Sequence, residues 1–270
     1  EVGEAQRWIG VGGFQIQPAE FTKLAIIVFS AAFLSKKSIR MDNFWNSSFI
    51  PLAVMGLSFL LIVEQPDLGT GLVIAAVVVV IIFAAGIPYK QLFYLAIPGL
   101  PAVLYLALSE GYRMKRILSF LDPWADPLDT GYHIIQSLYA LGPGGLFGVG
   151  LGRSRQKLYY LPEPQNDFIF AIIGEELGFL GAVTIMLLFF ILFWRGFKTS
   201  LMAPDTFGSL LAAGLTGMVT IQALINIGVV TGSIPITGIN LPFISAGGSS
   251  LFFTMCAMGI LLNISRYIRS

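Results

Sequence analysis

The chain contains 270 residues, of which 56% are hydrophobic and only 11% are charged, and its formal net charge is +1. An ordinary soluble domain is about 45–50% apolar and about 25% charged, so this composition excludes a typical soluble protein and predicts an integral membrane protein. We expect no nucleic-acid partner. The single Cys256 lies in an apolar run, which excludes a disulfide framework and a cysteine metal site.

The N-terminus predicts that upstream sequence is missing. The chain opens with Glu1 instead of Met, and neither the charged region nor the hydrophobic region of a signal peptide follows. We therefore expect a fragment that lacks upstream membrane spans.

Seven apolar stretches approach the length of about 20 residues that a helix needs to cross a bilayer. In chain order they are residues 18–36, 47–63, 68–86, 91–109, 167–194, 207–231 and 246–265. They predict an all-α fold, a polytopic helical membrane protein with one membrane domain over residues 1–270. Only residues 64–67 join the second and third stretches, which predicts a tight hairpin.

Lys and Arg residues in alternating loops predict the orientation of the spans. Eight of them fall on one side, which the positive-inside rule makes cytoplasmic: Lys36, Lys37, Arg40, Lys90, Arg195, Lys198, Arg266 and Arg269. Residues 110–166 fall on the opposite side and carry six basic residues, but the rule weakens for loops of this length. We therefore predict a large extracytoplasmic loop, whose cations meet either an anionic partner or the acids of the loop itself.

Two apolar stripes at helical spacing predict short amphipathic helices in this loop, lying on the membrane surface. The first stripe is Ile117, Phe120 and Leu121, and the second is Ile134, Ile135, Leu138, Tyr139 and Leu141. His133 is the only histidine of the chain. No nucleophile-elbow motif accompanies it, so we expect it to have a structural role.

A glycine-rich and basic stretch follows the second stripe. Glycines between residues 142 and 152 let backbone approach a ligand closely, although such a loop is often only a turn. Arg153, Arg155 and Lys157 come directly after them. Because Arg and Lys bind phosphate oxygens, the pattern predicts a phosphate or pyrophosphate site, and an anionic lipid surface is the alternative ligand.

Asp167 stands at the start of the fifth span, directly before an apolar run. A carboxylate at that depth is poorly hydrated, which is how a general base gains proton affinity. Asp is also a good helix N-cap, and position alone favours the cap.

Charged residues also lie inside the predicted spans, where they indicate either function or paired structure. Glu20 and Lys23 share a helical face and can pair, and Glu175 and Glu176 are expected to pair across the bundle. Gln222 and Asn226, four residues apart, can bond across helices. The glycine-rich segment 232–250 has no charge, which argues against a second ionic site.

Several motifs in order resemble the SEDS family (shape, elongation, division and sporulation), which includes FtsW, RodA and SpoVE. They are Arg7-Trp8-Ile9, Gln17–Lys23, Gln65–Thr70, the glycine-basic stretch, Leu161-Pro162-Glu163, Asp167–Phe170, Glu175–Gly178, Pro242 and Gly247–Ser250. The long loop is most similar to the SpoVE and FtsW branch. The resemblance implies ten spans, of which the seven found here would be the last, in a multi-pass protein of the bacterial inner membrane.

The resemblance further implies a peptidoglycan glycosyltransferase that polymerises lipid II in division, elongation or spore cortex synthesis and releases undecaprenyl pyrophosphate. Asp167 would be its general base, and a class B penicillin-binding protein its transpeptidase partner. On this hypothesis the substrate-binding residues are Lys23, Arg153, Arg155, Lys157, Glu163 and Gln165. No cofactor is required, although a divalent cation, Mg²⁺ or Mn²⁺, can share the charge. The alternatives are a lipid II flippase and a non-catalytic scaffold for a transpeptidase.

Overall fold

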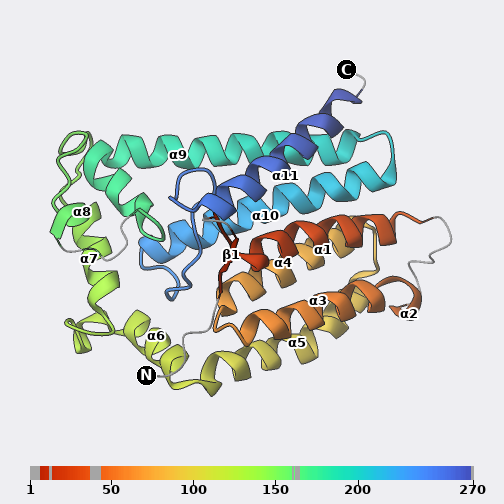
Figure 1. Cartoon of the computed structure of the whole chain (residues 1–270), viewed down its shortest axis with the longest axis horizontal. Helices are drawn as coiled ribbons and strands as arrows, with labels where there is room; N and C mark the ends of the chain where they lie inside the picture. Colours follow the sequence, from red (N-terminus) through yellow and green to blue (C-terminus); the bar gives the residue numbers. More distant parts are fainter. Residues whose placement is uncertain (1–6, 12–13, 37–43, 160, 162–164, 269–270) are drawn as a thin grey trace. The chain divides into compact units, whose positions relative to one another are not determined.

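The computed structural model describes residues 7–11, 14–36, 44–159, 161 and 165–268, and helices dominate it (Figure 1). The main elements are β1 (Ile9–Val11), β2 (Phe14–Ile16), α1 (Pro18–Leu34), α2 (Phe44–Ser47), α3 (Phe49–Val63), α4 (Leu68–Ala84), α5 (Tyr89–Ser109), α6 (Gly111–Leu121), the 3-10 turn η1 (Pro123–Ala125), α7 (Tyr132–Leu141), α8 (Gln156–Tyr159), α9 (Ile169–Met202), α10 (Thr206–Val230) and α11 (Gly248–Arg266). The chain divides into two compact units, and α5, α9 and α10 contribute to both.

Each of the seven stretches expected to cross a membrane contains one long helix: α1, α3, α4, α5, α9, α10 and α11. Within the described residues, α9, α10 and α11 are long and apolar enough to cross a membrane by length and composition. Apolar helices that are shorter include α3, α4 and the Ile97–Ser109 part of α5. Which helices cross the bilayer, and in which direction, stays a prediction.

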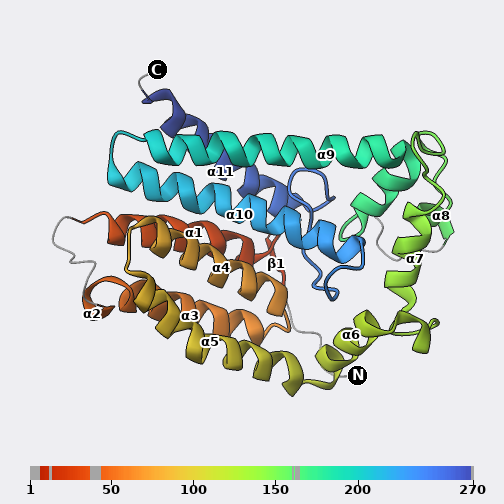
Figure 2. The same cartoon turned by 180° about the vertical axis from the view of Figure 1, so that it is seen from behind.

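The first unit comprises residues 1–99, 191–221 and 248–270. Here α1 packs against α3, α4 and α11 (Figure 2). The tight link between α3 and α4 forms as predicted, and Asp67 caps α4 by accepting a hydrogen bond from the backbone N–H of Thr70 at 3.0 Å. A Cβ added to Gly214 of α10 would lie within 3 Å of Ile27 and Ile81, so this glycine allows close helix packing.

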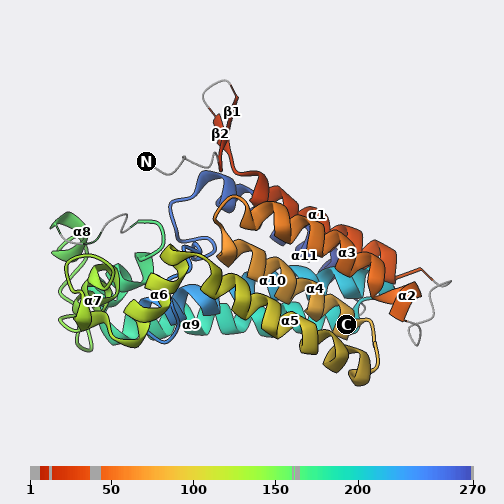
Figure 3. The ribbon, with the colours of Figure 1, turned by 90° about the horizontal axis from the view of Figure 1, so that it is seen from below.

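A two-stranded antiparallel hairpin precedes α1, and the all-α expectation did not include it. Ile9 pairs with Ile16, and Figure 3 shows the hairpin standing out from the helices of its unit. Ser249, at the start of α11, accepts from the backbone N–H of Gln17 at 3.3 Å and donates to the carbonyl of Gln15 at 2.9 Å. Strands of three residues are too short for their alternation to be recognised in the sequence.

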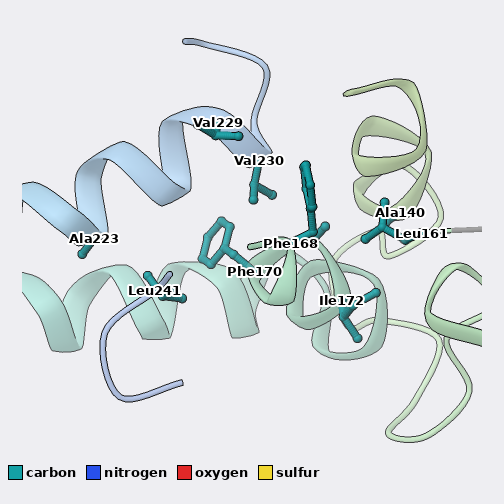
Figure 4. Packing of buried hydrophobic residues seen from close by; sticks show 10 residues of the cluster. Ala140, Leu161, Phe168, Phe170, Ile172, Ala223, Val229, Val230 and Leu241 are labelled. Atoms are coloured by element: carbon teal, nitrogen blue, oxygen red, sulfur yellow. The ribbon is translucent and has the colours of Figure 1, made fainter. Parts of the chain in front are cut away.

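The second unit comprises residues 100–190 and 222–247 and holds the candidate site. Its hydrophobic core gathers side chains from α7, the first half of α9, the end of α10 and the segment after it (Figure 4). The buried members are Ala140, Leu161, Phe168, Phe170, Ala171, Ile172, Ala223, Val229, Val230 and Leu241. Because Phe168 and Phe170 flank the start of α9, their burial fixes the chain next to Asp167.

Candidate functional site

A pocket of about 440 Å³ lies in the second unit and has Asp167 in its wall. Its polar lining consists of Tyr112, Lys115, Arg116, Ser119, Asp129, Thr130, His133 and Asp167, and the remaining lining residues are Phe168, Ile236 and Gly238. This volume is within the range of about 300–1,000 Å³ that is usual for small-molecule sites. The pocket therefore combines two carboxylates, two cations and aromatic side chains.

Helix α6 supplies the cationic side of the pocket. Tyr112, Lys115, Arg116 and Ser119 have the spacing i, i+3, i+4 and i+7, which places them on one face of the helix. The guanidinium of Arg116 lies 5.8 Å from the ring centroid of Tyr112, a cation–π distance. Neither Lys115 nor Arg116 forms an ion pair with any residue that the structure describes. Both cations are thus available to an anionic ligand.

Asp167 also lines the pocket and lies two residues before α9 begins. Its carboxylate is partly exposed and faces the backbone of Gly238, where an added Cβ would lie 3.5 Å from the Asp167 Oδ2. The next residue, Phe168, is buried and stacks on the ring of His133 at a centroid distance of 5.8 Å. His133 therefore packs on Phe168 while also lining the pocket, and its expected structural role stays a prediction.

The glycine-basic stretch packs against α9, and two acids of α9 hold it. The buried Glu175 accepts hydrogen bonds from the Ser154 hydroxyl and from the backbone N–H of Arg155, the latter at 3.0 Å. Glu176 pairs with the Lys157 ammonium at 3.1 Å. The expectation that these glutamates pair across the bundle is wrong, because the loop before α9 supplies their partners.

Helix α9 is broken at Gly178, whose φ of 68° and ψ of −166° are not helical, so the expected fifth span is not one continuous helix. The loop completes the hydrogen bonds that the break interrupts. Val149 and Gly150 donate to the Glu175 and Glu176 carbonyls at 2.9 and 3.1 Å, while Phe179 and Leu180 donate to the Gly145 and Leu146 carbonyls at 2.8 and 3.2 Å. Backbone groups at a helix end need such partners when they are buried.

Close backbone contact explains why several positions in the loop and in α9 require glycine. A Cβ added to Gly144 would lie 2.0 Å from the Gly174 carbonyl oxygen, and one added to Gly148 would lie 2.1 Å from that of Glu176. Gly178 has a positive φ, and an added Cβ would lie 2.3 Å from the backbone nitrogen of Gly148. These glycines let the loop approach α9, which is a structural use, and the approach of a ligand to the loop stays a prediction.

Comparison with known proteins relates this geometry to a family. The model of the FtsW/RodA/SpoVE family, described as "Cell cycle protein", matches residues 1–270. The chain belongs to this family. Stage V sporulation protein E of Bacillus subtilis (strain 168) is 56% identical over 266 residues, which cover 98% of the chain and 72% of that protein. A probable peptidoglycan glycosyltransferase FtsW of Geobacter sp. (strain M18) is 43% identical over 265 residues, with 98% and 72% coverage.

Solved structures agree with the family assignment. A chain of the structure described as "Structural coordination of polymerization and crosslinking by a peptidoglycan synthase complex" has a TM-score of 0.79 and 29% identity, covering 100% of this chain and 76% of that one. RodA of Thermus thermophilus, a rod shape determining protein, has a TM-score of 0.69 and 29% identity, with 100% and 72% coverage. This SEDS protein is therefore a helical membrane protein with a role in peptidoglycan synthesis.

The substrate-binding residues that the sequence suggested do not gather around Asp167 in the described part of the structure. Arg153, Arg155 and Lys157 are exposed on the loop, and none of them lines the Asp167 pocket. Gln165 is exposed, and its carbonyl accepts from the backbone N–H of Ala246 at 2.8 Å. Glu163 lies outside the described residues. The assignment of these side chains to substrate stays a prediction.

Lys23 belongs to the first unit and is almost fully buried, with 3% of its surface exposed. Its ammonium lies 2.8 Å from the Glu20 carboxylate, so the predicted pairing on one helical face forms. The surrounding side chains come from α1, α4 and α10 and are apolar. Lys23 is thus neutralised inside its own helix, which is a structural arrangement.

The described part of this SEDS protein has no group of three or more His, Cys, Asp or Glu side chains that could hold a metal ion. Asp129 and Asp167 both line the pocket, but a third protein ligand of these types does not accompany them. Mg²⁺ can be held by one or two carboxylates together with substrate phosphates, so the divalent cation stays a prediction.

Lys115 and Arg116 were not singled out as site residues from the sequence, where they counted only among the basic residues of the loop. A signal was present: the polar residues 112, 115, 116 and 119 alternate with the apolar residues 117, 120 and 121 on a helical period. That pattern defines two faces of α6. The pattern does not show which face of α6 lies near Asp167, because α6 and Asp167 are about fifty positions apart in the sequence.

Proposed function

We propose that this SEDS protein is a peptidoglycan glycosyltransferase that polymerises lipid II, with Asp167 as the general base. One observation carries the proposal: a single pocket brings Asp167 together with Lys115 and Arg116. The names of the FtsW relatives and the likeness to a chain of a peptidoglycan synthase complex support it. The family role in peptidoglycan synthesis gives the substrate class.

The reaction needs one proton acceptor and charge stabilisation at the leaving group. Asp167 takes the proton of the attacking sugar hydroxyl, and the hydroxyl oxygen forms a bond to the anomeric carbon of the donor. The bond from that carbon to the pyrophosphate oxygen breaks, and its electron pair leaves with undecaprenyl pyrophosphate. Lys115 and Arg116 stabilise the negative charge that develops there. A single displacement of this kind inverts the anomeric centre.

Asp129 gives the pocket a second carboxylate, but it is an exposed residue of the loop between η1 and α7. Asp167 is the better base, since the buried Phe168 and the start of α9 fix its backbone, and a base must be held within hydrogen-bond reach of the hydroxyl. The exposed ring of Tyr112 offers apolar surface against which a sugar ring can pack. The pocket thus supplies a base, an anion site and a sugar-binding wall.

The flippase alternative rested on four charged residues inside the spans. In the structure Glu20 pairs with Lys23, and Glu175 and Glu176 bind the loop before α9. These partners indicate that the four residues stabilise the fold. No observation favours a polar path for a lipid headgroup along them. We also propose a class B penicillin-binding protein as partner, by analogy with the synthase complex named for polymerization and crosslinking.

The test is an assay of the intact purified protein on lipid II, alone and with its transpeptidase partner. The proposal predicts glycan polymer and release of undecaprenyl pyrophosphate. Movement of lipid II across vesicle membranes without polymer would instead indicate a flippase. Complex formation with the transpeptidase and no polymer under either condition would indicate a scaffold.

A further inference from the structure

We propose that Asn226 and Ser245 are positioning residues that set the direction of the Asp167 carboxylate. This inference rests on the proposed role of Asp167 as general base. It arises from the hydrogen bonds of the chain on either side of Asp167, all of which lie within the second unit. Neither residue lines the pocket, so both would act through Asp167 and not on the substrate.

Three consecutive carbonyls leading into α9 each accept a hydrogen bond from a donor far along the chain. The Gln165 carbonyl accepts from the backbone N–H of Ala246 at 2.8 Å. The Asn166 carbonyl accepts from the Ser245 hydroxyl at 2.7 Å, and the Asp167 carbonyl accepts from the Asn226 side-chain amide at 2.7 Å. We call these three bonds the carbonyl clamp.

The clamp holds both peptide planes that flank the Cα atom of Asp167. The Asn166 carbonyl belongs to the plane before this Cα, and the Asp167 carbonyl belongs to the plane after it. Because each peptide unit is planar, fixing both carbonyls fixes φ and ψ of Asp167. The direction of its Cα–Cβ bond follows from those two angles. The clamp therefore sets the direction in which the Asp167 side chain leaves the backbone.

Asn226 also holds a second segment that lines the pocket. Its side-chain nitrogen donates a second bond, also of 2.7 Å, to the carbonyl of Ile239. The neighbouring Gly238 is the residue whose backbone faces the Asp167 carboxylate. One amide group therefore ties the chain at Asp167 to the chain beside Gly238, which sets the spacing between them.

The chemistry of Asn226 fits this use. Only 1% of the residue is exposed, and both of its bonds run to carbonyl oxygens, so the amide nitrogen must face them. Its Oδ1 has no hydrogen-bond partner among the described residues. An unpaired buried oxygen is costly, and an apolar side chain would avoid that cost. The two donated bonds give a reason for an amide at this position.

Ser245 contributes twice to the same arrangement. Its hydroxyl donates to the Asn166 carbonyl and accepts from the backbone N–H of Leu241 at 2.8 Å. The second bond closes the turn 241–245, which the backbone bond from Ser245 to the Leu241 carbonyl at 3.0 Å also closes. Ser245 therefore orders its own turn while it holds the chain before Asp167.

The test compares Ser245→Ala with Ser137→Ala in the intact protein and its complex. Ser137 is a matched control, because it is fully buried in the same unit and its hydroxyl donates to the Val230 carbonyl at 2.8 Å, a bond that is not part of the clamp. We expect Ser245→Ala and Asn226→Ala to lower kcat for lipid II polymerisation by roughly 10–100-fold with little change in KM, since a misplacement of about 1 Å can cost about 100-fold. Ser137→Ala should lower only the melting temperature.

The inference is overturned if the folded fraction of Ser245→Ala has the same kcat as that of Ser137→Ala. It is also overturned if KM rises while kcat stays constant, since that pattern indicates a lost substrate contact. Asp167→Asn is measured in parallel to separate the two proposals. If Asp167→Asn is inactive and Ser245→Ala is fully active, the clamp fails and the proposed function stands. If Asp167→Asn is fully active, the proposed function fails and the clamp fails with it.

Discussion

Replacing Gly148 by alanine tests the packing of the loop on the break in α9. An added Cβ would lie 2.1 Å from the carbonyl oxygen of Glu176 and 2.6 Å from the backbone nitrogen of Leu177, so it meets backbone that cannot move aside easily. The φ of Gly148 is +80°, which costs a non-glycine residue about 1–2 kcal/mol. Overpacking adds about 1–3 kcal/mol. We therefore expect a loss of about 2–5 kcal/mol.

Gly152→Ala is the matched control. Its φ is +79°, but no atom lies within 4 Å of an added Cβ, so only the conformational cost of about 1–2 kcal/mol remains. In a domain of this size 1 kcal/mol corresponds to roughly 2–4 °C, and Gly148→Ala should thus melt roughly 2–12 °C below Gly152→Ala. The measurement is thermal unfolding of the purified protein in detergent, followed by circular dichroism. Equal melting temperatures would refute the close contact between the loop and α9.

Three further predictions concern charged side chains. Replacing Lys115 and Arg116 by Gln should lower kcat/KM for lipid II polymerisation by roughly 10–100-fold, because a hydrogen bond to a charged group is worth about 1.5–3 kcal/mol. Glu20→Gln should lower the free energy of unfolding by about 3–5 kcal/mol, since it leaves Lys23 buried and unpaired, and adding Lys23→Met should restore most of that loss. Glu175→Gln should cost about 1–3 kcal/mol, since it weakens two hydrogen bonds to the loop. Thermal unfolding measures the last two effects.

Each of these predictions has a contrary outcome. Arg153→Gln with Arg155→Gln should reduce turnover less than the α6 replacements, and a larger reduction would move the anion site to the loop. A Glu20→Gln, Lys23→Met protein that is no more stable than Glu20→Gln would argue against the buried pair. If Glu175→Gln has wild-type stability, the loop does not need the Glu175 carboxylate to stay bound to α9.

The sequence predicted the helices well because their cause is local. Apolar runs approaching 20 residues have few conformations available in a membrane, so most of the helix ends lie within about two residues of the expected bounds. The exception is α9, which ends at Met202 and not at residue 194 as expected. The break at Gly178 could not be predicted in the same way. Nothing near Gly178 indicates that its neighbours will bond to residues 145–150, about thirty positions earlier.

The candidate site was predictable only in part. Asp167 was found through the family resemblance, while position alone favoured a helix cap. Asn226 was recognised as a residue able to bond across helices, but its partners are carbonyls outside helices, at Asp167 and Ile239. The uncharged segment 232–250 supplies part of the clamp through Ser245. Such contacts depend on which distant segments meet, which a periodic pattern does not encode.

The most direct test of the central claim is the rate of lipid II polymerisation by the Asp167→Asn variant of the intact protein. A positioned general base contributes roughly 100–10,000-fold, so kcat should fall by at least about 100-fold while the variant stays folded and still binds lipid II. Asp126→Asn is the control, because Asp126 is an exposed acid of the preceding loop that does not line the pocket. Its rate should equal that of the wild type. Polymerisation by Asp167→Asn at the wild-type rate would contradict the assignment of the base.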